Sequence, residues 1–298
     1  MSLLTIDIGG TSIKYARFDK GQLSNQGAFA TPDNLETFYQ HLSAVVEQFK
    51  ENSDVCGVAI SSPGAVNKIS GVIEGASALP YIHNFDIHSE FEKRFGLPVS
   101  IENDANCAAL AEVKFGAAKG HSDVLFLVLG TGVGGSVVVD GKIHHGKHLF
   151  GGEFGFMLMD EENSFSTLGT TVRMAERYNT RTGEKLDAID IFKLAFAGNK
   201  MAKEEMDIFT FNVAKGIFNL SYSFDPECVI IGGGVSQAEW LIPELQKQLQ
   251  KIMDTIKIAP FMPEITACQF KNDANLIGAT VDFAQTFDEV KNYSVGVS

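Results

Sequence analysis

The fold is decided by how the chain opens, with the stretch Leu3-Leu-Thr-Ile-Asp-Ile-Gly-Gly-Thr-Ser-Ile-Lys-Tyr-Ala-Arg-Phe18. Its first six residues are mostly apolar, and residues 12–18 form a second strand candidate after the small residues 9–11. The dipeptide Lys20-Gly21 then turns the chain again. This order predicts a β-hairpin at the start of the fold.

A second stretch repeats this order further along the chain. An apolar strand candidate over residues 124–129 is followed by the glycine-rich residues 130–135 and a β-branched strand candidate over 136–139. The apolar residues 55–60 and 228–231 are likewise each followed by small residues. The sequence therefore implies two copies of one α/β unit.

Helical periodicity fills the intervals between these strands, over residues 35–50, 104–115, 203–224, 242–253 and 275–287. A chain of 298 residues exceeds one typical core, so we predict a two-lobed, duplicated α/β fold with a cleft between the lobes. We place the boundary in the small, polar segment 116–122, giving an N-terminal lobe of residues 1–118 and a C-terminal lobe of 119–298. The last helix is predicted to return to the N-terminal lobe, and the polar residues from Asp288 onward to form a loose tail.

Composition excludes several classes of protein. A formal net charge of -13 disfavours nucleic acid as a partner, because binding to a phosphate backbone requires clustered Lys and Arg. No apolar run approaches the ~18 residues of a membrane span, and the start of the chain lacks the features of a secretory signal, so we expect no membrane partner and a cytoplasmic location. The four cysteines are scattered, which favours reduced thiols over disulfides or a thiolate zinc site.

Two glycine-rich turns are candidates for phosphate binding. Gly130-Thr-Gly-Val-Gly-Gly135 matches the G-x-G-x-x-G pattern, but a strand follows it where the dinucleotide fingerprint requires a helix. Its backbone amides could cradle a phosphate, or the segment could be an ordinary tight hairpin. In Asp7-Ile-Gly-Gly-Thr11, the carboxylate of Asp7 suits Mg²⁺ held through water, or alternatively stabilises the turn.

Two acidic segments could act on an alcohol substrate. Asn103 and Asp104 stand between a strand and an alanine-rich helix, where either side chain could cap the helix or Asp104 could accept a proton from an attacking hydroxyl. Glu153 lies among glycines and aromatics in Phe150-Gly-Gly-Glu-Phe-Gly-Phe156, a composition suited to sugar binding, or is an exposed loop acid. The nearby His144, His145 and His148 lack a completing ligand, so packing or solvated histidines are favoured over a metal site.

Taken together, five segments resemble the ROK family of bacterial sugar kinases in order and spacing: Asp7–Thr11, Glu102–Asn106, Gly130–Gly135, Gly151–Gly155 and Gly232–Gly234. This resemblance covers nearly the whole chain and implies an actin/hexokinase-like fold, ATP and Mg²⁺ as cofactors, a homodimer, and Asp104 as catalytic base. It implies sugar contacts from Gly64, Asn84, Asn103, Asp104, Glu153 and Phe156. Nucleotide contacts are implied for Asp7, Gly9, Gly10, Thr11, Lys14, Gly130, Thr131, Gly132, Gly134, Gly135, Gly233 and Gly234.

The chain departs from the common pattern of this family at two points. Phe156 stands where many members carry a histidine that binds zinc and sugar, and residues 157–171 contain no cysteine, so we expect no structural zinc. A second sugar-binding glutamate of that loop also has no counterpart. In these respects the chain is most similar to the zinc-free β-glucoside kinases of the family, which implies transfer to the 6-hydroxyl of the non-reducing glucose in sugars such as cellobiose or gentiobiose.

Other activities remain open on the same residues. A glucokinase or an N-acetylmannosamine kinase could use the same sugar contacts. A non-catalytic sugar sensor related to ROK repressors would need a DNA-binding module, for which the six residues before Asp7 leave no room. We expect in-line transfer of the γ-phosphoryl group of ATP to a sugar hydroxyl.

Overall fold

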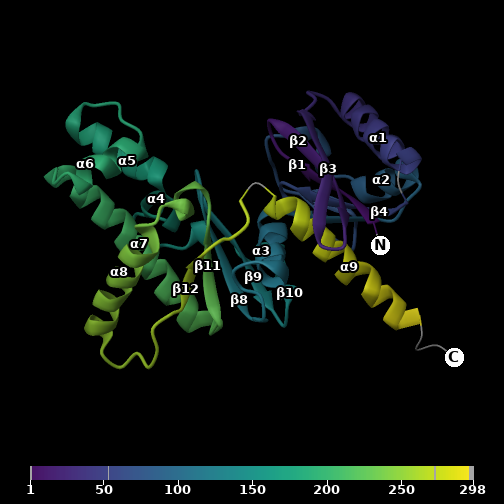
Figure 1. Ribbon diagram of the computed structural model, residues 1–298. Helices are drawn as coiled ribbons and strands as arrows, with labels where there is room; N and C mark the ends of the chain where they lie inside the picture. Colours follow the sequence, from purple (N-terminus) through teal and green to yellow (C-terminus); the bar gives the residue numbers. More distant parts are fainter. Residues whose placement is uncertain (1, 53, 272, 295–298) are drawn as a thin grey trace. The chain divides into compact units, whose positions relative to one another are not determined.

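The computed structural model describes residues 2–52, 54–271 and 273–294 in two compact units, which are taken one at a time (Figure 1). Unit 1 comprises residues 1–115, 146–150 and 270–298, and unit 2 comprises 116–145 and 151–269. Within the described residues, no helix is both long and apolar enough to cross a membrane.

Unit 1 is built on a five-stranded sheet in the order β3-β2-β1-β4-β7. Strands β1, β2 and β3 are antiparallel neighbours, whereas β1, β4 and β7 run parallel. A separate hairpin, β5–β6, follows β4. The elements are β1 (Ser2–Ile8), β2 (Ser12–Asp19), β3 (Gln22–Ala30), α1 (Leu35–Asn52), β4 (Val55–Ser62), β5 (Ala65–Asn67), β6 (Val72–Glu74), η1 (Pro80–Ile82), α2 (Ile87–Phe95), β7 (Val99–Asn103), α3 (Asp104–Phe115) and α9 (Ala274–Ser294).

Unit 2 repeats this arrangement with a sheet in the order β10-β9-β8-β11-β12. Strands β8, β9 and β10 are antiparallel neighbours, and β8, β11 and β12 run parallel. The elements are β8 (Val124–Leu129), β9 (Val133–Val139), β10 (Lys142–Ile143), η2 (Phe154–Phe156), α4 (Phe165–Leu168), α5 (Thr171–Thr182), α6 (Ala188–Phe196), α7 (Lys200–Phe224), β11 (Cys228–Gly232), η3 (Gly234–Gln237), α8 (Leu241–Ile256) and β12 (Ile265–Ala267). The matching strand orders confirm the predicted duplicated α/β fold.

Each unit has its own hydrophobic core. In unit 1 the buried face of α1 brings Phe38 against Phe91 of α2, with ring centroids 6.1 Å apart, and Phe91 stacks on Phe95. On the other face of the sheet, α9 lies alongside α3 (Figure 1). Thr5 Oγ1 of β1 donates a hydrogen bond of 2.6 Å to the carbonyl of Leu276 in α9. The last helix therefore belongs to the N-terminal unit.

Two local predictions were wrong. Gly134 and Gly135 do not lie in a loop but continue β9, pairing with Val128 and Leu127. At position 135 the strand can form only with glycine, because a Cβ there would lie 2.3 Å from the carbonyl oxygen of Phe126. The predicted loose tail from Asp288 is helical up to Ser294, since adding residues to an existing helix costs far less than nucleating one; residues 295–298 lie outside the described part.

Candidate active site

Asp7 is held at the carboxyl end of β1 by two neighbouring elements of unit 1. Ser61 Oγ of β4 donates to Asp7 Oδ1 at 2.9 Å, and Asn275 Nδ2 at the start of α9 donates to the same oxygen at 3.0 Å. The side chain is nearly buried, and among the described residues no hydrogen bond reaches Oδ2. Since Mg²⁺ prefers oxygen ligands and retains water, this free carboxylate oxygen fits a water-mediated metal contact.

The turn after Asp7 is closed by hydrogen bonds and exposes its tip. Gly9 N donates to Ser12 O at 3.1 Å, and Thr31 Oγ1 donates to Gly9 O at 2.6 Å. Gly10 and Thr11 are exposed. Lys14 lies directly opposite Asp7 in the β1–β2 ladder, so the two side chains project from the same face of the sheet.

Asn103 and Asp104 both bond to the first turn of α3. Asn103 Oδ1 accepts from the amides of Ala105 and Asn106 at 2.9 and 3.2 Å, and Asp104 Oδ1 accepts from the Ala105 amide at 2.8 Å. Asn103 and Asp104 thus both cap α3, the role that the sequence left open for either of them. Asn103 Nδ2 also donates to the carbonyl oxygen of Gly64 at 3.1 Å, which joins two predicted sugar residues directly.

The electrostatic surroundings of Asp104 favour its neutral form. Burial raises the pKa of this carboxyl above its ordinary value, and the charge of Asp7 raises it further, while the hydrogen bond from Ala105 N opposes both effects. A raised pKa makes the carboxylate a better proton acceptor, because a general base works best with a pKa near the working pH. Asp7 and Asp104 are therefore close enough in unit 1 to influence each other.

Gly64 and Asn84 are arranged by the β5–β6 hairpin. Gly64 has a φ of +98°, which side chains disfavour, and a Cβ there would lie 2.7 Å from Ile73. Asn84 N donates to Ile73 O at 3.1 Å, leaving its side chain exposed. The buried His83 hydrogen-bonds Ser77 Oγ through Nε2 at 2.7 Å and Ile73 O through Nδ1 at 3.2 Å. Both predicted residues thus flank the same hairpin.

In unit 2, two glycine segments lie at one edge of the sheet. The parallel strands β8 and β11 are neighbours, and Gly130–Gly132 and Gly233–Gly234 follow their carboxyl ends. Gly130 N donates to Gly132 O at 3.0 Å, and Thr131 and Gly132 are exposed at the tip. Carboxyl ends of parallel strands are where open α/β sheets bind ligands, and small residues here let a phosphate approach the backbone.

Glu153 and Phe156 lie on a turn that packs beside the tip of the β8–β9 hairpin. Both side chains are exposed, Phe156 to 74%. Gly155 packs against Val133 at the start of β9, and Val133 N donates to Ser166 Oγ of α4 at 3.0 Å. The predicted sugar turn and the predicted phosphate loop of unit 2 are consequently packed together.

The histidine cluster forms no metal centre among the described residues. His144 and His145 belong to unit 2, whereas His148 belongs to unit 1. Within the described parts of the chain, no group of three or more His, Cys, Asp or Glu side chains is arranged to hold a metal ion.

Four supporting residues were missed in the sequence: Ser61 and Asn275, which hold Asp7, His83 beside Asn84, and Ser166 behind the phosphate loop. Ser61 had a visible signal, because the apolar residues of β4 end in the two small polar residues Ser61 and Ser62. For Asn275 no local signal exists, since its partner lies 268 positions away.

Comparison with known proteins gives a consistent result along the whole chain. The ROK family profile matches residues 3–285. A β-glucoside kinase from Listeria monocytogenes is 33% identical over 301 residues, covering 96% of this chain and 98% of that protein.

Solved structures agree with this. A ROK family protein from Streptococcus pneumoniae in complex with sucrose is 36% identical, with a TM-score of 0.88 over 97% of this chain and 100% of that one. A ROK family glucokinase from Streptomyces griseus in complex with glucose and AMPPNP is 26% identical, with a TM-score of 0.73 over 96% of this chain and 100% of that one. Fold, motifs and matched length together mean that the chain belongs to the ROK family.

Proposed function

We propose that this protein transfers the γ-phosphoryl group of ATP to the 6-hydroxyl of the non-reducing glucose in a β-glucoside such as cellobiose or gentiobiose. At the coarser level the chain is an ATP-dependent carbohydrate kinase of the ROK family. The observation that carries the mechanism is Asp104, a carboxylate with a raised pKa at the head of α3, beside Asn103 and its bond to Gly64.

In this proposal Asp104 accepts the proton of the sugar hydroxyl as that oxygen attacks phosphorus. Asn103, Asn84 and Gly64 orient the sugar in unit 1, and Glu153 of unit 2 binds further hydroxyls. The bound Mg²⁺ would neutralise charge on the phosphates, and Asp7 would hold it through water. The exposed turns at Gly9–Thr11 and Gly130–Gly132, with Lys14, Gly134, Gly135, Gly233 and Gly234, would bind the nucleotide.

Preference for a β-glucoside rests on Phe156. An exposed aromatic ring beside Glu153 can cover the apolar face of a second sugar, whereas a histidine at that position would hydrogen-bond a free anomeric hydroxyl. Leu158, also exposed to 75%, extends this apolar surface. The relative from S. pneumoniae holds the disaccharide sucrose, which supports a site with room for two sugar rings.

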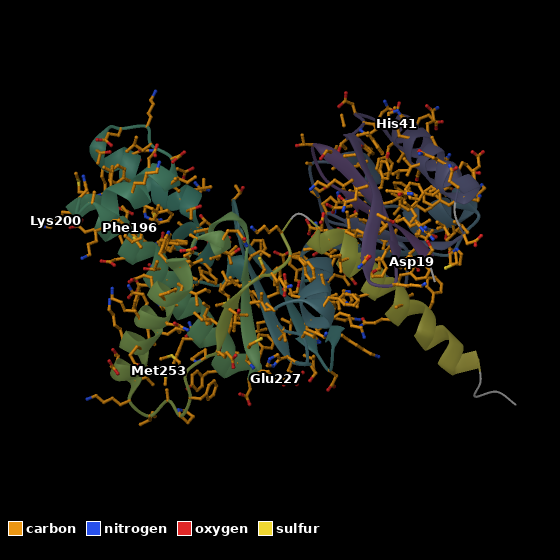
Figure 2. All side chains as sticks on the ribbon, in the orientation of Figure 1. Asp19, His41, Phe196, Lys200, Glu227 and Met253 are labelled. Carbon is orange, nitrogen blue, oxygen red and sulfur yellow. The ribbon has the colours of Figure 1, made fainter. Side chains whose placement is uncertain are left out.

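Asp104→Asn tests the mechanism. Asparagine can still cap α3, so the fold should survive, while turnover should fall by about 10² to 10⁴-fold, the usual effect of losing a general base. The matched control is Asp19→Asn, because Asp19, labelled in Figure 2, is a partly exposed acid of β2 in the same unit. Its ion pair with Arg17 spans 3.9 Å. Near wild-type turnover in Asp104→Asn would leave only the capping role.

A coupled ATP-consumption screen tests the substrate. It should compare cellobiose and gentiobiose with glucose, fructose and N-acetylmannosamine at fixed ATP. We expect the β-disaccharides to have kcat/KM values about 10- to 200-fold above glucose, the range that one pocket contact supplies. Phe156→His should lower the ratio of kcat/KM for a β-disaccharide to kcat/KM for glucose. A preference for glucose or N-acetylmannosamine over every β-disaccharide would overturn the β-glucoside assignment and leave the kinase activity intact.

A further inference from the structure

A lysine at the tip of the β5–β6 hairpin reaches two buried carboxylates of unit 1. Lys68 lies in the turn after β5, and its Nζ is 3.1 Å from Glu102 Oε2 on β7 and contacts Asp282 Oδ1 on α9. The Glu102 and Asp282 side chains are 1% and 4% exposed, whereas that of Lys68 is 33% exposed. Buried carboxylates require a partner, so the hairpin tip supplies the positive charge for both.

Glu102 connects this lysine to the first turn of α3. While Oε2 faces Lys68, Oε1 accepts from Asn103 N at 2.8 Å and from Asn106 Nδ2 at 2.9 Å. These two residues flank the segment that carries Asp104. A shift of the Glu102 carboxylate would therefore move hydrogen bonds on both sides of the proposed base.

The other end of the hairpin carries the proposed sugar contacts. Gly64 directly precedes β5, and Ile73 of β6 accepts the hydrogen bond from Asn84 N. Since Asn103 Nδ2 also bonds Gly64 O, the hairpin is fastened to β7 at both ends, through Gly64 at its base and Lys68 at its tip.

Other titratable groups lie on elements packed around this cluster. Burial alone would lower the pKa of Lys68, but the charges of Asp282 and Glu102 outweigh burial and raise it. Burial and these same carboxylates raise the pKa of Cys107 on α3, with a smaller contribution from Asp7 on β1. His88 of α2 lines a cavity of about 50 Å³ that Lys68 also borders. Lys68 is thus the cation that faces two acids, and the cluster keeps one net negative charge.

We propose that Lys68 is a positioning residue for the sugar site, which it fixes by tying the tip of the β5–β6 hairpin through Glu102 to the first turn of α3. This inference rests on the proposed function for the roles of Asp104, Asn84 and Gly64. Lys68 itself is not among the residues proposed to contact the sugar or the nucleotide.

The test compares Lys68→Met with Lys93→Met, an exposed lysine of α2 in the same unit. Lys68→Met should lower kcat/KM for the sugar by about 10- to 100-fold, because displacing a reacting group by about 1 Å costs up to that much. The loss should appear as a higher sugar KM and a lower kcat, with an unchanged KM for ATP. Lys68→Arg should recover most of the activity, and Lys93→Met should behave as wild type.

Lys68→Met leaves two acids facing each other and could fail to fold. The double variant Lys68→Met with Asp282→Asn restores the wild-type net charge of the cluster but still lacks the tie to Glu102. We expect it to fold and to retain the raised sugar KM. In the single variant the loss should shrink toward that of the double variant as pH falls from 8 to 6, because a proton on Asp282 relieves its repulsion with Glu102. A fold defect alone would lower the amount of active protein without changing KM.

Amide hydrogen exchange separates this inference from the proposed function. Residues 103–106 and the hairpin should exchange at least about tenfold faster in the double variant than in wild type, whichever sugar is used, since local opening reports lost contacts directly. Unchanged exchange together with an unchanged sugar KM would overturn the role of Lys68. If the wild type phosphorylates no sugar, the proposed function fails, and exchange alone decides whether Lys68 positions these segments.

Discussion

Replacing Asp282 by asparagine should stabilise the protein at neutral and alkaline pH. Asp282 lies on α9 and is nearly buried, and Lys68 contacts its Oδ1. Burial raises its pKa from 3.8 to about 6, with Glu102 adding to the rise and Lys68 opposing it. An acid whose pKa is raised by folding destabilises the folded protein above that pKa, because its charge is easier to carry in the unfolded chain.

The magnitude follows from the shift. About two pKa units at roughly 1.4 kcal/mol each give a penalty of about 3 kcal/mol. This penalty is almost fully present above pH 6. It shrinks as pH falls from 6 toward 3.8, the ordinary pKa of an aspartate, and vanishes only below that value, where Asp282 is protonated in both states. Asparagine is neutral throughout, so Asp282→Asn should exceed wild type by up to about 3 kcal/mol at pH 8 and by less than about 1 kcal/mol at pH 4.

Urea denaturation of wild type, Asp282→Asn and Asp19→Asn at pH 4.5, 6 and 8 measures this difference. The control removes a partly exposed acid from the same unit, where a surface ion pair contributes less than about 1 kcal/mol. If Asp282→Asn were less stable than wild type at pH 8, the ion pair with Lys68 would outweigh the burial of the charge, and the reasoning from the raised pKa would be refuted.

Four further outcomes are expected. Elemental analysis of gently purified protein should find no stoichiometric zinc, because Phe156 stands at the histidine position and residues 157–171 lack cysteine; about one zinc per chain would contradict this. Asp7→Ala should raise the Mg²⁺ concentration for half-maximal activity at least about tenfold, and an unchanged Mg²⁺ dependence would remove Asp7 from the metal site. Light scattering should give the mass of a homodimer, as the family resemblance implies, and the mass of a monomer would contradict this expectation. Glu205→Gln should cost about 2 kcal/mol, measured by denaturation, because this buried acid accepts from two arginines of α5; no loss would mean that the arginines are solvated equally well without it.

The first strand of each unit was predictable because its apolar residues end at glycines. Strands β1 and β8 are buried over most of their length, and the turns after them carry the glycines that mark the hairpins. Helix α5 was not predicted, since only Met174 and Tyr178 of its twelve residues are buried and the rest are largely polar. Two buried apolar residues one turn apart, in an otherwise polar segment, are too few for a helix to be recognised from the sequence.

Of the candidate site, likewise, only part could be predicted from the sequence. Asn103 and Asp104 were visible because a strand, two polar residues and an alanine-rich helix follow one another within a single segment. The cluster of Lys68 and Asp282 could not be predicted from the sequence, because these residues are 214 positions apart and neither lies in a recognisable pattern. A charge on a hairpin turn normally indicates a solvated surface, and only the packing of α9 reveals that this one is compensated.

Unit 1 concentrates negative charge to a degree that stability alone would not favour. Asp7, Glu102, Asp104 and Asp282 come from four different elements, and Lys68 pairs with only two of them. Burial and the charge of Asp7 raise the pKa of Asp104, which makes its carboxylate a better proton acceptor but also makes its charged form harder to bury. Such a cost is typical of a site whose groups are arranged for chemistry. Lys68 pairs with Glu102 and Asp282, so its positive charge is supplied to these two supporting carboxylates and not to Asp7 and Asp104, the two residues that the proposed phosphoryl transfer would use.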